Sequence, residues 1–170
     1  EISKGLVGSE MCIRDSNLIE WLPKNIPDDD ETTIVHGDYR LDNMILRNNE
    51  VIGILDWELS TLGHPIADFS YHCLSWRTQE AFWDEAKLKE LGIPSEKEYM
   101  EMYCKYSGKD LSKNWEFYMA FNMFKIAGIL QGILGRVRDG TAASKHAEER
   151  GNMVFPLSQA AWETIENNFL

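Results

Sequence analysis

The 170-residue sequence has few cysteines and a deficit of basic residues. Three cysteines cannot all pair with one another, so we expect no disulfide framework and a reducing, cytoplasmic location. The cysteines and the four histidines show no spacing typical of a zinc site. Lysine and arginine number 17 against 28 acidic residues, a formal net charge of -11. This charge argues against nonspecific binding to nucleic acids or to anionic membranes.

The sequence also lacks a long uninterrupted apolar run. The most apolar segment, 115–137, contains five polar residues: Glu116, Asn122, Lys125, Gln131 and Arg136. We therefore predict no membrane span there, but a helix over 112–137 that forms the buried centre of its domain. Residues 1–16 lack both the continuous apolar core and the basic leader of a signal peptide.

The first residues are unusual for a different reason. The segment Gly8 to Ser16 reads like translated sequencing-adaptor sequence rather than natural protein. We interpret residues 1–16 as a non-native leader, the alternative being an ordinary flexible start, and assign the folded part to residues 17–170.

Apolar residues make up 44% of the chain and charged residues 26%, which is the composition of a globular protein. A short amphipathic segment over 17–22 precedes a region of short strands. The turn residues Asn48 and Asn49 predict a hairpin over 44–55, and Gly63 and Pro65 predict a loop. The remaining expected elements are strands over 32–35, 44–47 and 51–55, and helices over 66–77, roughly 80–91, 95–107 with Ser95 as N-cap, 112–137 and 144–168.

Two polar loops follow strand ends, where functional residues are common. The first is His36-Gly37-Asp38-Tyr39-Arg40-Leu41-Asp42-Asn43, and the second starts Leu55-Asp56-Trp57-Glu58. A hairpin between Asn43 and Asp56 would bring these two residues to one site. Their oxygens suit Mg²⁺, and the carboxylate of Asp38 can accept a proton from a hydroxyl.

The spacing fits the template for phosphoryl transfer. In that template a catalytic loop reads His-x-Asp-x-x-x-x-Asn, and a second Asp at the end of the next hairpin holds the metal. Asn43 lies five residues after Asp38, and Asp56 takes the place of the metal-binding Asp in an Asp-Trp-Glu sequence.

These two motifs, followed by Gly63-x-Pro65-x-x-Asp68, resemble the aminoglycoside phosphotransferase family of protein-kinase-like enzymes. The resemblance covers about residues 17–170. It is greatest to the branch that includes the kinase domains of acyl-CoA dehydrogenase family members ten and eleven. It implies an α+β fold, mostly α: a kinase-like C-terminal lobe with a short catalytic hairpin and a helical body.

The resemblance also implies roles for single residues. Asp38 would act as the catalytic base, or would orient the acceptor hydroxyl, and Asn43 and Asp56 would hold Mg²⁺ on the phosphates of ATP. Arg40 would reach the transferring phosphate, the alternative being a surface ion pair with Asp42.

Three further residues would support the loop. His36 is expected to be a packed loop anchor, Gly37 to allow close backbone approach, and Asp68 to brace the loop through backbone N–H groups. Glu58 could be a ligand of a second metal ion or a solvated acidic residue of the loop. A late basic cluster fits either an anionic acceptor or a solvated helix face: Arg136, Arg138, Lys145 and Arg150.

A complete kinase of this type also needs a nucleotide-binding lobe with a strand Lys, a helix Glu and a linker that holds adenine. We find no candidates for these in the sequence, so we expect the 170-residue chain alone to have little kinase activity.

The leading hypothesis is thus an ATP- and Mg²⁺-dependent kinase that phosphorylates a hydroxyl of a small molecule. The branch implies a hydroxylated acyl-CoA or hydroxy acid as acceptor, and fusion to an acyl-CoA dehydrogenase domain in relatives. One alternative is a kinase for an aminoglycoside, choline or another amino alcohol. Another is a non-catalytic pseudokinase or interaction module, although a pseudokinase would not need Asp38, Asn43 and Asp56 together.

Overall fold

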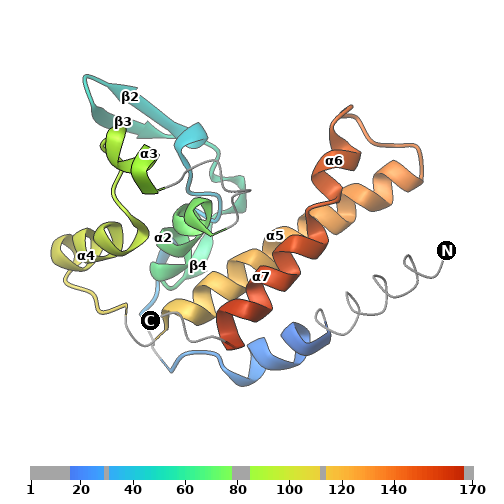
Figure 1. Ribbon diagram of the computed structural model, residues 1–170, viewed down its shortest axis with the longest axis horizontal. Helices are drawn as coiled ribbons and strands as arrows, with labels where there is room; N and C mark the ends of the chain where they lie inside the picture. The colour runs from blue at the N-terminus through green and yellow to red at the C-terminus, as the bar shows by residue number, and fades with distance from the viewer. Residues whose placement is uncertain (1–15, 29–30, 78–84, 112–113, 167–170) are drawn as a thin grey trace. The chain divides into compact units, whose positions relative to one another are not determined.

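The computed structural model describes residues 16–28, 31–77, 85–111 and 114–166 (Figure 1). It divides into two compact units. One is Asp28–Tyr118, and the other combines Glu1–Pro27 with Met119–Leu170. The first unit contains all the described strands, and the described part of the second is helical.

Two small antiparallel sheets form the start of the first unit. Strand β1 (Thr33–Val35) pairs with β4 (Thr61–Gly63), and β2 (Met44–Arg47) pairs with β3 (Glu50–Ile54). The prediction of a loop at Gly63 was therefore wrong for 61–63. Gly63 of β4 lies opposite Thr33 of β1. A side chain at position 63 would crowd Val35, which also belongs to β1. The strand pairs with a segment far away in sequence, so local composition did not reveal it.

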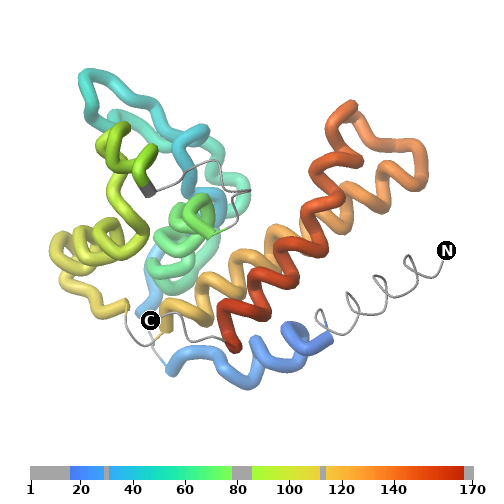
Figure 2. The backbone as a smooth tube through the Cα atoms, in the orientation of Figure 1, coloured from blue at the N-terminus to red at the C-terminus, as the bar shows by residue number. Residues whose placement is uncertain are grey.

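The hairpin predicted over 44–55 is confirmed. Asn48 and Asn49 have φ values of 50° and 64°, the left-handed conformation that a tight two-residue turn requires and that asparagine tolerates. In Figure 2 the hairpin projects at the edge of its unit. At its base the backbone N–H of Leu55 donates to the carbonyl of Asn43 at 2.8 Å. Pairing of the two strands thus brings the end of one functional loop to the start of the other.

Helices complete the first unit. The segment predicted as one helix over 66–77 forms α2 (Ile66–Cys73) and ends in a 3₁₀ turn, Leu74–Trp76. Helix α3 is Glu85–Glu90, and the earlier part of the helix predicted over 80–91 lies outside the described residues. Helix α4 (Glu96–Ser107) begins at the expected N-cap Ser95, which forms a reciprocal capping box with Glu98.

Helix α5 (Trp115–Arg138) begins in the first unit and continues in the second. Trp115 and Met119 are fully buried, but Ile129 is 49% exposed. The prediction of a buried central helix therefore holds for its first half and was wrong for its second half. By length and composition alone α5 could cross a bilayer, and a third of its most apolar window is buried inside the protein.

In the second unit, α7 (Val154–Glu166) runs beside α5 (Figure 1), where Val154 and Leu157 pack with Ala127. The helix predicted over 144–168 was wrong as a single element, because α6 (Ala147–Gly151) ends before α7 begins. Gly151 lies so close to Leu134 that any side chain at 151 would overlap it. Pro156, the third residue of α7, lies in a first turn, where its missing N–H is tolerated.

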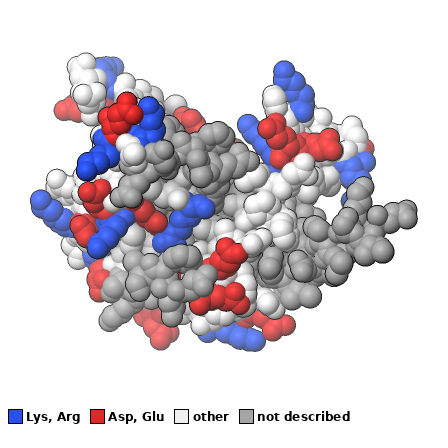
Figure 3. All heavy atoms as spheres, in the orientation of Figure 1, with Lys and Arg blue, Asp and Glu red and all other residues white. Residues whose placement is uncertain are grey.

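Charged side chains of both signs are intermixed on the face that Figure 3 shows. On this face the acidic side chains therefore do not form one continuous negative patch.

Candidate active site

Three side chains hold the carboxylate of Asp38. The Tyr71 hydroxyl donates to Asp38 Oδ1 at 2.6 Å, and the Asn43 amide donates to Oδ2 at 2.8 Å. Arg40 Nε lies 3.3 Å from the same Oδ2. The Asn43 amide also donates to the Asp38 backbone carbonyl at 2.8 Å. These contacts fix the orientation of the carboxylate, which is 17% exposed.

The same contacts determine the protonation states of Asp38 and Tyr71. Partial burial raises the pKa of Asp38, but the hydrogen bonds from Tyr71 and Asn43, together with the charge of Arg40, outweigh it and lower the pKa below its ordinary value. Burial, and then the hydrogen bond to Asp38, raise the pKa of Tyr71 far above its ordinary range. Asp38 is therefore an anion near neutral pH and Tyr71 a neutral donor.

The backbone of the loop is braced by Asp68 at the start of α2. Asp68 Oδ2 accepts a hydrogen bond from the backbone N–H of His36 at 2.6 Å, and Oδ1 accepts one from that of Gly37 at 2.8 Å. The resemblance predicts this contact for Asp68. It links α2 directly to the two residues that precede Asp38.

His36 connects the two functional loops. Its Nε2 lies 2.7 Å from the carbonyl of Leu55, so this nitrogen must carry the proton and donate it. Its Nδ1 then accepts from the backbone N–H of Asp38 at 3.2 Å. Both contacts need the proton on Nε2 rather than on Nδ1. With 2% of the residue exposed, His36 is placed as a packed anchor of the loop.

Gly37 is the one position in this loop where the backbone demands glycine. Its φ is +82°, in the left-handed region, and a Cβ there would overlap the carbonyl oxygen of Leu59. The close approach of the two loops therefore depends on the absence of a side chain at 37.

Asn43 and Asp56 lie at the base of the hairpin, and their donor atoms fit Mg²⁺. The Asn43 amide nitrogen faces two acceptors of Asp38, which leaves Oδ1 without a hydrogen bond from any described residue. Asp56 has φ 63° and ψ 60°, unusual for a residue other than glycine, and its exposed carboxylate pairs with no described residue. An amide oxygen and a carboxylate are hard ligands of the kind that Mg²⁺ prefers.

Within the described part of the chain, no group of three or more His, Cys, Asp or Glu residues lies close enough to hold a metal ion. A cation held by Asn43 and Asp56 would need its other oxygens from phosphate and water, as Mg²⁺ does in nucleotide sites.

The remaining residues singled out from the sequence are placed as follows. Arg40 contacts Asp38 and also Asp42, whose Oδ2 lies 3.6 Å from Nη1, so the alternative ion pair is present. Glu58 is exposed in the 3₁₀ turn Trp57–Leu59. The late basic cluster is exposed and belongs to the second unit, so the unit that contains Asp38 does not include it.

Sequence reasoning missed Tyr71. Nothing marks it as functional, because tyrosine in an amphipathic helix is ordinarily a packing residue. Only its position three residues after Asp68, on nearly the same face of α2, could have indicated that it faces the loop.

The sequence is similar to a family model and to known proteins. The family model described as "Phosphotransferase enzyme family" matches residues 12–103. Acyl-CoA dehydrogenase family member 10 of Mus musculus is 43% identical over 153 residues, which are 86% of this chain and 14% of that protein. Acyl-CoA dehydrogenase family member 11 of Homo sapiens is 38% identical over 159 residues, which are 89% of this chain and 20% of that protein.

A solved structure is also similar. The crystal structure of a putative aminoglycoside phosphotransferase from Ralstonia eutropha JMP134 has a TM-score of 0.81 and 46% identity, and the match covers 91% of this chain and 49% of that one. The chain thus spans about half of that protein and a fifth or less of the two curated relatives. These matches confirm the resemblance and the mostly helical, kinase-like α+β fold. By its family match, its solved neighbour and its catalytic-loop motif, the chain belongs to the phosphotransferase enzyme family.

Proposed function

We propose that this chain is the catalytic part of a kinase that transfers the γ-phosphoryl group of ATP to a hydroxyl of a small molecule. The observation that carries the proposal is the fixed, anionic carboxylate of Asp38, hydrogen-bonded by Asn43 and Tyr71. Family membership supports phosphoryl transfer in general. The hydroxyl acceptor, ATP and Mg²⁺ are parts of the proposal.

In this proposal Asp38 accepts a hydrogen bond from the acceptor hydroxyl and directs a lone pair of its oxygen at the γ-phosphorus. As the new P–O bond forms, the bond to the β-phosphate oxygen breaks, and the hydroxyl proton passes to Asp38. A carboxylate with a lowered pKa is a weak base, so its main contribution is to orient the hydroxyl.

Two other residues have parts in the same step. Asn43 Oδ1 and the Asp56 carboxylate would hold Mg²⁺, which supplies neutralisation of the charge on the phosphates. Arg40 is 53% exposed beside Asp38, from where its guanidinium can exchange Asp42 for an oxygen of the transferring group.

For the acceptor, we propose a hydroxylated acyl-CoA or a hydroxy acid, because the relatives named above are acyl-CoA dehydrogenase family members. The alternative is an aminoglycoside or amino alcohol, because the solved structure is of a putative aminoglycoside phosphotransferase. A non-catalytic role is disfavoured by the joint presence of Asp38, Asn43 and Asp56, since Asn43 Oδ1 and the Asp56 carboxylate pair with none of the residues that the structure describes.

An acceptor panel tests the proposal. We would replace the matching half of the Ralstonia protein with residues 17–170 of this chain, and measure ADP formation with hydroxyacyl-CoA, hydroxy acids, choline and an aminoglycoside. The proposal predicts acceptor-dependent turnover with the hydroxyacyl compounds. Turnover restricted to the amines would overturn the acceptor class. Absence of turnover with every hydroxyl compound, in a chimera shown to fold and to bind ATP, would overturn the kinase proposal.

A further inference from the structure

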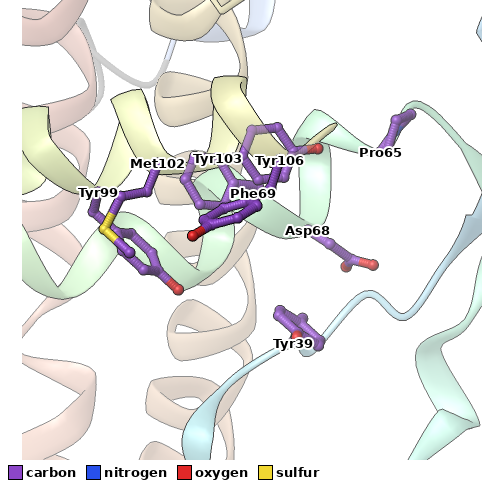
Figure 4. A pocket seen from close by; sticks show the side chains of 8 residues that line it. All are labelled: Tyr39, Pro65, Asp68, Phe69, Tyr99, Met102, Tyr103 and Tyr106. Atoms are coloured by element: carbon purple, nitrogen blue, oxygen red, sulfur yellow. The ribbon is translucent and has the colours of Figure 1, made fainter. Parts of the chain in front are cut away.

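A pocket of about 380 Å³ lies beside the catalytic loop within the unit Asp28–Tyr118. This volume lies in the range of small-molecule sites. We call it the aromatic pocket. It is lined mainly by one residue of the loop, two of α2 and three of α4: Tyr39, Asp68, Phe69, Tyr99, Met102 and Tyr103. In Figure 4, Tyr39 lies across the open space from Phe69, Tyr99 and Tyr103.

The pocket is close to the proposed chemistry. Tyr39 directly follows Asp38 in the chain, and its ring packs against His72 of α2, the residue next to Tyr71. Asp68 lines the pocket and also accepts the backbone hydrogen bonds of the loop. A molecule in the pocket would therefore touch the catalytic loop itself.

Stacking covers part of the ring surface that a cation would use. Phe69 and Tyr103 are stacked on each other, with centroids 3.8 Å apart and planes at 13°. Tyr99 is stacked on Trp76, with centroids 5.2 Å apart and planes at 24°. A cation binds to the open face of a ring, whereas ring edges carry partial positive charge. These stacked pairs occupy at least one face of each ring, so fewer faces remain for an ammonium group.

The charged group in the pocket wall is already engaged. Among the described lining residues Asp68 is the one with a charge; its carboxylate remains an anion, but both of its oxygens accept backbone hydrogen bonds of the catalytic loop. Burial is the main cause that raises the pKa values of Tyr99 and Tyr103, so both remain neutral phenols. A wall formed mainly by aromatic rings and the side chain of Met102 favours apolar groups of a ligand.

We propose that the aromatic pocket binds an alkyl or acyl chain of the phosphoryl acceptor, rather than an ammonium group. That the bound chain belongs to the phosphoryl acceptor rests on the proposed function. The preference of the pocket for an alkyl over an ammonium group can be tested without turnover.

The test measures binding to the 170-residue chain by calorimetry, with 1-butanol, 1-hexanol, 1-octanol and choline as probes. Burial of apolar surface predicts a gain in affinity of up to about fourfold per methylene group. Choline should bind at least about tenfold more weakly than 1-octanol, because it offers less apolar surface and because stacking covers ring faces that its ammonium group would need. Choline binding as tight as that of 1-octanol, or an affinity independent of chain length, would overturn the proposal.

Variants of α4 show whether the probes bind in this pocket. Met102 is 45% exposed, so Met102→Trp can fill the space without disturbing the core, and Met102→Leu should retain binding. Glu101→Trp adds the same ring at an exposed neighbour that does not line the pocket, and serves as the matched control. We expect 1-octanol affinity to fall at least about tenfold in Met102→Trp alone, with circular dichroism unchanged. Equal affinities in Met102→Trp and wild type would overturn the assignment.

The same variants separate this inference from the proposed function. In the chimera, Met102→Trp should raise KM for long-chain acceptors more than it lowers kcat, and Asp38→Asn in the isolated chain should leave 1-octanol binding within about twofold. Chain-length-dependent binding that requires the pocket, in a protein without turnover, would leave the pocket in place and sink the kinase proposal. Turnover that is insensitive to both chain length and Met102→Trp would support the kinase proposal and overturn the assignment of the pocket.

Discussion

The hydroxyl of Tyr71 donates a hydrogen bond to Asp38 Oδ1 at 2.6 Å and connects helix α2 to the catalytic loop. The loop motif does not include Tyr71, yet this contact contributes to the lowered pKa of Asp38. Since Asn43 holds the other carboxylate oxygen, both oxygens of Asp38 are fixed by neighbours. The carboxylate is therefore oriented before any substrate binds.

Tyr71→Phe tests this contact. Loss of one hydrogen bond to a charged group should lower the free energy of unfolding by about 1.5–3 kcal/mol at neutral pH. Because the bond lowers the pKa of Asp38, its loss should raise that pKa, and the acid limb of the chimera's pH–rate profile should move to higher pH. Ser75→Ala removes an exposed hydroxyl that donates to the backbone carbonyl of His72 and does not line the pocket; it is the control and should change neither. An unchanged acid limb in Tyr71→Phe would contradict this role.

His72 should make stability depend on pH. Its pKa is lowered from 6.5 chiefly because burial disfavours the charged ring beside Tyr39 and Tyr99. The unfolded chain then takes up the proton at a higher pH than the folded chain. The contribution of His72 to the free energy of unfolding is therefore complete above pH 6.5, and it is lost as the pH drops from there through the pKa of the folded state. Urea unfolding between pH 8 and 5 should show a smaller decline in His72→Gln than in wild type, whereas Ser107→Ala, an exposed change that removes no titratable group, should decline like wild type.

Gly37→Ala should damage the loop more than the same change at another left-handed glycine. Gly108 has φ +72° with open space around it, so Gly108→Ala should cost only the backbone strain, about 1 kcal/mol. Gly37→Ala adds an overlap with Leu59, and we expect a loss of about 2–4 kcal/mol in the free energy of unfolding. Urea midpoints of the two variants provide the comparison, and equal losses would contradict the close approach.

Asp56→Asn tests the metal site. Asparagine tolerates the left-handed backbone at 56, so the change removes charge without adding strain. We expect turnover of the chimera to fall by about 100-fold or more, partly recoverable at high Mg²⁺. Glu58→Gln, at the exposed acid two residues later, should change turnover less than about threefold. A loss at Glu58 as large as that at Asp56 would instead favour the reading of Glu58 as a ligand to a second metal.

The parts of the structure that were predictable depend on local chemistry. Asn48 and Asn49 specify a turn, Ser95 and Glu98 specify a helix start, and the His36–Asn43 spacing specifies a loop; all lie within a few residues of what they determine. The pairing at the base of the hairpin followed from the turn.

The parts that were missed depend on contacts between distant segments. Strand β4 forms because 61–63 meets β1, nearly thirty residues earlier in the chain. Gly151 is required because Leu134, in an earlier helix, leaves no room for a side chain there, and Tyr71 has its role because its hydroxyl reaches the carboxylate of Asp38. The aromatic pocket combines a loop residue with residues of α2 and α4, a combination that no local pattern contains.

The most direct measurement compares Asp38→Asn with Asp42→Asn in the chimera. Both changes replace a carboxylate of the catalytic loop by an amide of the same shape. Asp38 is held by three side chains, whereas Asp42 is 79% exposed and contacts only Arg40 among the described residues. We expect phosphoryl transfer to fall by about 1000-fold or more in Asp38→Asn and by less than about threefold in Asp42→Asn, with both proteins folded. Turnover within tenfold of wild type in Asp38→Asn would contradict the assignment of Asp38 as the group that orients the acceptor hydroxyl.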